Sequence, residues 1–154
     1  MRKIPLTKGH FAIVDDEDYE ELSKYKWYSS LGRAVRGIPK GDNMAKIHMH
    51  RVIAQTPEGM DTDHINGDPL DNRRSNLRWA TRSQNLSNKG MNRNNKSGFK
   101  GVFWFKNYKK WLATIRVDKK RIFLGYFKDK IEAAIAYNNA AIKYHNEFAK
   151  LNII

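Results

Sequence analysis

The chain contains no cysteine, which excludes disulfide bonds and cysteine-ligated zinc sites. It also lacks any run approaching the ~20 apolar residues that a membrane-spanning helix requires. The N-terminal stretch MRKIPLTKGHF has no hydrophobic core of the kind found in signal peptides. These absences lead us to expect a soluble, cytoplasmic protein.

Acidic residues are scarce relative to basic ones. The 154 residues hold 29 Lys and Arg against 16 Asp and Glu, which gives a formal net charge of +13 and a pI of about 10.0. Most of this excess lies in residues 96–154, which contain 13 basic and 4 acidic side chains. Such a balance indicates a polyanionic partner, and nucleic acid is the first candidate.

The first 60 residues predict a scaffold of short strands around one helix. The apolar run HFAIV (10–14) is followed by DDEDYEELSKYKWY (15–28), whose acidic start is typical of a helix N-terminus. KWYSS (26–30) and RAVRGI (33–38) predict a hairpin, and AKIHMHRVI (45–53) predicts a further element.

His48 and His50 lie two residues apart in the last of these segments. On a strand they would share a face and could hold a metal ion. A pair of histidines without a third ligand is more often structural, so both interpretations stay open.

Residues 62–85 predict a hairpin followed by a helix. TDHINGD (62–68) reads as a short strand that turns at Asn66-Gly67, a dipeptide that tolerates positive φ. NLRWAT (76–81) predicts the return strand, with Leu77 and Trp79 on one face. Thr81 with Gln84 three residues later matches a capping box, so a helix should begin at Thr81.

The polar residues of this segment suit phosphodiester hydrolysis. That reaction needs a base to take a proton from water and a cation to stabilise charge on the phosphate and the leaving 3′ oxygen. His64 is the candidate base, because its ordinary pKa lies near neutrality. Asp63 and Asn85 offer oxygen ligands, which Mg²⁺ prefers, and we expect Asn85 to face Asp63 and His64 from the helix.

The stretch from HRVI through DHINGDPLDNRRSNLRWATRSQN resembles the ββα-metal motif of HNH nucleases, particularly the homing endonucleases of phages and introns. The resemblance implies that Asp63 and Asn85 ligate Mg²⁺ (or Mn²⁺), that His64 is the general base and that Asn76 braces the loop. A bacterial or phage-infected cell is the implied setting. Turn chemistry alone is the alternative explanation for an isolated Asp-His or Asn-Gly pair.

The C-terminal third predicts three strands and a helix. GVFWF (101–105), KWLATIRV (110–117) and RIFLGYF (121–127) are separated by turns, and a helix follows with Asp129 as its N-cap. Small and aromatic residues should form the helix face that packs on the sheet: Ala133, Ala136, Tyr137, Ala140 and Tyr144.

Strand alternation sorts the two faces of this sheet. If Ala113, Ile115, Ile122 and Leu124 face the helix, the open face carries Leu112, Thr114, Arg116, Arg121 and Phe123. An exposed sheet with Arg beside aromatic residues is a plausible reader of the DNA major groove.

SGFKGV, KWLATIRV, RIFLGYF and the following EAAIAYNNAAIKYHNEFAKLN resemble the DNA-binding domain of plant Apetala-two/ethylene-response factors (ERF). The resemblance implies DNA contacts by Lys100, Thr114, Arg116, Arg121 and Phe123. Its first strand differs, with Phe103-Trp104-Phe105 where the plant domains are rich in Arg, so no target sequence is transferred. Further candidate DNA contacts are Arg78, Trp104 and Lys106.

Together these patterns predict an α+β protein with an HNH nuclease domain at 1–90, its ββα-metal motif at about 61–90, an Asn-rich linker at 91–97 and a sheet-and-helix DNA-binding domain at 98–154. The expected function is metal-dependent cleavage of double-stranded DNA, with a monomer favoured. The competing functions are a DNA-binding regulator with an inactive HNH scaffold and a structure-directed RNA binder.

Overall fold

The computed structural model describes residues 1–154 and is of mixed α+β type, as predicted. The chain divides into two compact units, Met1–Thr81 and Arg82–Ile154. This division falls before the predicted linker, and the functional domain limits stay a prediction. No helix is both long and apolar enough to cross a membrane.

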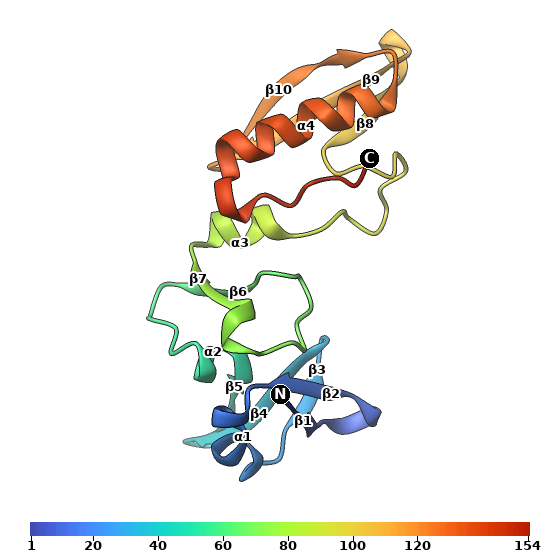
Figure 1. Cartoon of the computed structure of the whole chain (residues 1–154). Helices are drawn as coiled ribbons and strands as arrows, with labels where there is room; N and C mark the ends of the chain where they lie inside the picture. Colours follow the sequence, from blue (N-terminus) through green and yellow to red (C-terminus); the bar gives the residue numbers. More distant parts are fainter. The chain divides into compact units, whose positions relative to one another are not determined.

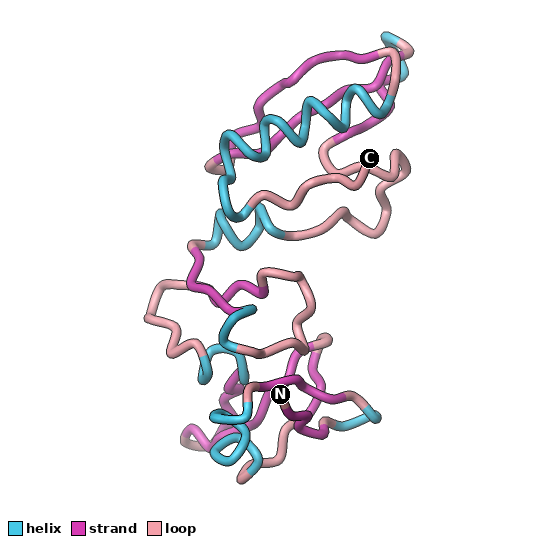
Figure 2. Tube along the Cα trace, viewed as in Figure 1, coloured by secondary structure: helices cyan, strands magenta, loops and turns pink.

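The first unit is built from short strands joined by turns and small helices (Figures 1 and 2). A two-stranded ribbon pairs β1 (Arg2–Pro5) with β2 (Phe11–Val14), and η1 (Thr7–Gly9) lies between them. After α1 (Asp16–Ser23), a sheet of order β3-β4-β5 is formed by Tyr28–Ser30, Arg33–Lys40 and Asn43–His48. The remaining elements are α2 (Met49–Ile53), β6 (Asp61–His64), η2 (Arg74–Asn76) and β7 (Leu77–Ala80).

One core holds this unit together. It gathers Val14 of β2, Leu22 of α1 and Met49 of α2 around the buried Trp27. The indole Nε1 of Trp27 donates a 2.8 Å hydrogen bond to the Leu22 carbonyl, so its one polar atom is satisfied inside the core. The N-terminal scaffold therefore fixes α2, which contacts the β6–β7 hairpin.

The expectation that His48 and His50 share a strand face is wrong. β5 ends at His48 and α2 begins at Met49, so His50 is helical. At this junction the side-chain period changes from two to 3.6 residues, and spacing by two no longer places residues on one face.

The second unit begins with α3 (Arg82–Asn88). Its antiparallel sheet has the order β10-β9-β8, formed by Lys120–Phe127, Lys110–Val117 and Val102–Phe105. η3 (Lys106–Tyr108) connects β8 to β9, and η4 (Asn146–Phe148) follows α4 (Lys130–His145). Figure 1 shows α4 lying along one face of the sheet, which confirms the predicted arrangement.

Small residues let α4 approach the sheet closely. Ala133, Ala134 and Ala141 are fully buried, and Asp129 accepts the predicted capping bond from the Ile131 N–H at 2.5 Å. Tyr137 packs over Gly101, where φ is +76° and a Cβ atom would lie 2.1 Å from the ring. Glycine is required there for both reasons.

The prediction that Tyr144 packs on the sheet is wrong, because its side chain is 39% exposed. Tyr144 lies in the last turn of α4, and the chain turns into η4 two residues later. Phe148 of η4 is the aromatic residue that is buried after the helix. The predicted partition of the strands is confirmed, since Ala113, Ile115 and Leu124 pack in the clusters that contain α4 residues.

Candidate active site

The β6–β7 hairpin presents the two central candidate residues at its turn end. Asp63 pairs in register with Arg78, and His64 pairs with Leu77. Gly67 has φ of +83°, and its N–H donates to the His64 carbonyl at 2.9 Å, which closes the predicted turn. Asp63 and His64 are both buried, so the hairpin holds its polar side chains away from bulk water.

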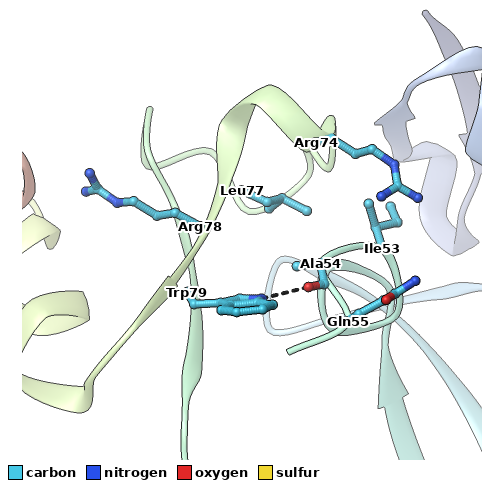
Figure 3. Close-up of a pocket in the computed structure, with 7 residues that line it drawn as sticks. All are labelled: Ile53, Ala54, Gln55, Arg74, Leu77, Arg78 and Trp79. Carbon is cyan, nitrogen blue, oxygen red and sulfur yellow. Dashed lines mark hydrogen bonds between the residues drawn. The ribbon is translucent and has the colours of Figure 1, made fainter. Parts of the chain in front are cut away.

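Neighbouring residues on a strand point to opposite faces. Figure 3 shows Leu77 and Trp79 beside α2, whereas Arg78 extends away from that helix. The Trp79 Nε1–H donates to the Ala54 carbonyl at 2.7 Å, in a pocket of about 370 Å³. This bond ties α2 to the hairpin and so fixes the surroundings of His64.

The side chain of Asn76 forms hydrogen bonds that hold the loop between β6 and β7 together. Its amide nitrogen donates to the Asp71 carbonyl at 2.8 Å and to Asn66 Oδ1 at 3.0 Å, while its own Oδ1 accepts from the Asn66 N–H. Asp71 is also paired with Arg73, whose guanidinium lowers the pKa of the Asp71 carboxyl. The loop is therefore bonded internally before any substrate arrives.

The N-terminal scaffold anchors the same loop from outside. Ile13 of β2 donates its N–H to the Leu70 carbonyl and accepts from the Asn72 N–H, both at 2.8 Å. Arg74 binds Asp18 through two of its guanidinium nitrogens, Nε and NH2, and its backbone N–H donates to Asp15. β2 and α1 thus set the position of the residues that follow the turn.

Asn72 orients the candidate base. It is fully buried, and its Oδ1 lies 3.1 Å from His64 Nε2. Because the Asn72 amide nitrogen donates to the Leu70 carbonyl, its oxygen faces the imidazole and accepts the Nε2–H. Neutral His64 then carries its lone pair on Nδ1. Burial lowers the pKa of His64 below its ordinary value, and the bond to Asn72 opposes that change.

The imidazole rings of His48, His50 and His64 lie next to one another in that order. The centroid of His50 is 5.3 Å from that of His48 and 5.1 Å from that of His64. Burial lowers the pKa of His50 to about 3, and the other two histidines add to the effect. No group of three or more His, Cys, Asp or Glu side chains is arranged to hold a metal.

A pH-dependent loss of stability follows from the burial of His50. Its pKa is near 6.5 in the unfolded chain and lower in the fold, so protons favour unfolding as the pH falls below 6.5. At pH 5 the loss should be about 2 kcal/mol relative to pH 7. Urea unfolding of His50→Phe, which keeps a ring in place, should show a smaller pH dependence. The matched control is His10→Phe at an exposed histidine; equal slopes in all three proteins would contradict this role.

Asp63 is the candidate metal ligand within the hairpin. Its Oδ2 lies 2.9 Å from both the Nε and the NH2 nitrogen of Arg78. A divalent ion binding here would meet one carboxylate that already has a cationic neighbour. Such a donor set fits Mg²⁺, which keeps several waters and takes one or two protein oxygens together with substrate phosphate.

Asn85, the other predicted ligand, lies in α3 of the second unit. This residue takes part in an interaction within the protein. Its approach to Asp63 stays a prediction. An amide oxygen from this helix would complete an all-oxygen ligand pair.

A protein-family model described as HNH endonuclease matches residues 48–87. The chain is 33% identical over 153 residues to an uncharacterized HNH endonuclease of Acanthamoeba polyphaga mimivirus, with 96% of this chain and 77% of that protein aligned. The chain belongs to the HNH endonuclease family. This HNH endonuclease is also 31% identical over 94 residues to Protein 3.8 of Escherichia phage T7, with 61% and 77% of the two chains covered. No solved structure matches it.

Sequence patterns missed three parts of the HNH site. Asn72, which orients His64, lies within the stretch that resembles the HNH motif but was given no role, because its position depends on the β2 backbone. His50 and Asp71 were likewise not assigned to the support of the site. The spacing of Asp71 and Arg73, which leaves one residue between them in a loop, is the only local signal for their ion pair.

The predicted DNA contacts of the second unit have different surroundings. Arg116, Arg121 and Phe123 are exposed on the open face of the sheet, and Thr114 is buried beneath them. Lys106 is exposed in η3. Two other candidates are engaged inside the unit: the Trp104 ring contacts Trp111, and the Lys100 amine donates to the carbonyls of Ser87 and Lys89. Burial lowers the pKa of Lys100 to about 8.

Proposed function

We propose that this HNH endonuclease is a homing-type enzyme that hydrolyses phosphodiester bonds of double-stranded DNA with the help of a divalent metal ion. The observation that carries the proposal is the setting of His64. Burial lowers the pKa of its imidazole and so favours the neutral form, its tautomer is set by Asn72, and it stands directly beside Asp63 at the end of β6.

His64 acts as the general base in this proposal. Nδ1 takes a proton from the attacking water as the new P–O bond forms and the bond to the 3′ oxygen breaks. A bound Mg²⁺ or Mn²⁺ supplies stabilisation of the charge on the phosphate and the leaving oxygen. Asp63 and Asn85 would hold that ion, and Asn76 keeps the loop rigid while the substrate binds.

The second unit selects the site of cleavage in this proposal. Residues 96–154 carry most of the positive charge, and no Asp or Glu occurs between Asp71 and Asp118. Lys and Arg contacts to phosphates would make binding strong and salt-dependent. Relatives occur in a mimivirus and in a phage, and their presence in viral genomes fits the homing-type role that the resemblance implies.

Cleavage should depend on a divalent metal. Supercoiled plasmid incubated with the protein should be nicked or linearised with Mg²⁺ or Mn²⁺ and remain intact with EDTA. Intact plasmid under all these conditions, together with retained DNA binding, would instead favour a DNA-binding regulator built on an inactive HNH scaffold.

Metal binding should also depend on DNA. The free protein offers a single carboxylate that is paired with Arg78, so calorimetry should detect only weak Mg²⁺ binding without DNA. Phosphate oxygens add ligands when DNA is present, and affinity should then rise. Equally tight Mg²⁺ binding to the free protein would contradict the proposed ligand set.

A further inference from the structure

The open face of the C-terminal sheet carries an apolar hollow. Phe103 of β8, Leu112 of β9 and Tyr126 of β10 lie side by side in one row across the three strands. Thr114 and Phe123 form the next row. All of these side chains point away from α4, because their neighbours Ala113 and Leu124 pack against that helix.

This hollow has a volume of about 370 Å³, and three of its six lining residues, Phe103, Leu112 and Phe123, have wholly apolar side chains. Thr114 is 8% exposed and lies at its floor, whereas Phe123 is 58% exposed and stands at its rim. The polar groups of the lining are the Thr114 hydroxyl, the Tyr126 hydroxyl and the Arg121 guanidinium. No Asn, Gln, Asp, Glu or Lys side chain takes part.

We propose that this hollow recognises thymine methyl groups in the major groove of duplex DNA. The inference rests on the proposed function, and it names the bases that the second unit selects. In the major groove the thymine methyl is the apolar group among the hydrogen-bonding edges of the bases. Phenylalanine rings and threonine methyls are the groups that contact it, and both line the hollow.

The positive charge beside the hollow suits a duplex. Arg121 lies directly opposite Arg116 in the sheet, two residue pairs beyond the row of Thr114 and Phe123 and therefore on the same face. Guanidinium groups at this end can bind the phosphates that flank the groove. Strands of a sheet lie about 4.8 Å apart, and a two-stranded β-ribbon fits the major groove, which is about 12 Å wide.

The packing of the rings argues against stacking on unpaired bases. Phe123 and Tyr126 meet at 61° with centroids 5.1 Å apart, and Tyr126 and Tyr108 meet at 74°. Rings in edge-to-face contact cover one another and do not present a series of free parallel faces. A single strand that stacks base after base on aromatic rings needs such faces.

Removal of the thymine methyl tests the proposal directly. The full chain, in EDTA to prevent cleavage, is titrated into a fluorescent duplex of alternating adenine and thymine and into the same duplex with deoxyuridine for thymidine. Affinity should fall at least about fourfold with deoxyuridine, the effect of exposing one buried methyl group. In a duplex of alternating guanine and cytosine, C5 methylation of cytosine should raise affinity by a similar factor.

Phe123→Ala should bind the thymine and uracil duplexes equally. The matched control is Ile142→Ala, which removes an exposed apolar side chain from α4 and should keep the full discrimination. A variant that is merely destabilised would weaken binding to both duplexes and leave their ratio unchanged. Discrimination that survives in Phe123→Ala would overturn the assignment to this hollow.

Other outcomes separate this inference from the nuclease proposal. Equal binding of both duplexes by the unaltered protein would overturn methyl recognition, while metal-dependent plasmid cleavage by the same preparation would keep the nuclease proposal. If the protein bound single-stranded DNA more tightly than either duplex, methyl recognition would be overturned in favour of base stacking. Absence of DNA binding at low salt would overturn both the inference and the proposed role of the second unit.

Discussion

Replacement of His64 with alanine should lower the rate of DNA cleavage by about a hundredfold to ten-thousandfold, the usual contribution of a general base. DNA affinity should change little, because the imidazole is buried and the positive charge of the protein is unaltered. Single-turnover cleavage of plasmid with Mg²⁺ measures the rate, and fluorescence anisotropy measures binding.

His48→Ala is the matched control for this experiment. It removes an imidazole from the same group of three rings, but His48 contacts His50 rather than the loop that carries the site. Cleavage should remain near that of the unaltered protein. Undiminished cleavage by His64→Ala would mean that another group takes the proton from water, and a loss of DNA binding would point to a folding defect.

The hairpin that holds Asp63 and His64 could be predicted because its signals are local. Asn66-Gly67 permits the positive φ of the turn, and Leu77 and Trp79 repeat with period two. The order of Asp63, His64 and Asn76 within this unit also needs no tertiary information. Local chemistry therefore indicates the hairpin and which of its side chains are candidates for the site.

The support of the site could not be predicted in the same way. Asn72 faces His64 because β2, far away in the sequence, holds the loop through two backbone bonds at Ile13. His50 meets His64 because the strand β5 gives way to a helix at Met49, a change that period-two spacing conceals. Both features depend on contacts between distant segments.

The sequence alone does not distinguish a basic side chain that binds DNA from one that is bonded inside the protein. Lys100 and Arg121 are both basic residues of the second unit, and each was a candidate DNA contact. The structure holds the Lys100 amine between two carbonyls, whereas Arg121 lies beside an apolar hollow on an exposed face. Burial distinguishes a lysine that is hydrogen-bonded inside the protein from an arginine at the surface. Because burial is a property of the fold, the sequence alone does not give it.

Replacement of Asp63 with alanine should abolish metal-dependent cleavage and destabilise the first unit. The Arg78 side chain is 16% exposed and would lose its carboxylate partner. Removing one member of a buried ion pair costs about 3 to 5 kcal/mol, because the remaining charge stays poorly solvated. Urea unfolding and plasmid cleavage with Mg²⁺ report the two effects separately.

The double variant Asp63→Ala/Arg78→Ala distinguishes a metal ligand from a counter-ion. Loss of both charges should restore most of the stability, because neither is then left buried alone. Cleavage should nevertheless stay absent, since the oxygen ligand is still missing. Recovery of cleavage in this variant would mean that Asp63 serves only to neutralise Arg78.

Arg78→Ala alone completes the comparison. It keeps the carboxylate and removes the guanidinium that lies 2.9 Å from it, so Mg²⁺ should bind the free protein more tightly than before. DNA affinity should fall if Arg78 also contacts DNA, as predicted from the sequence. Two results together would assign the carboxylate of Asp63 to the metal. Arg78→Ala should bind Mg²⁺ more tightly and still cleave DNA, and the double variant should be inactive. Arg78 would then be the counter-ion of Asp63 in the free protein.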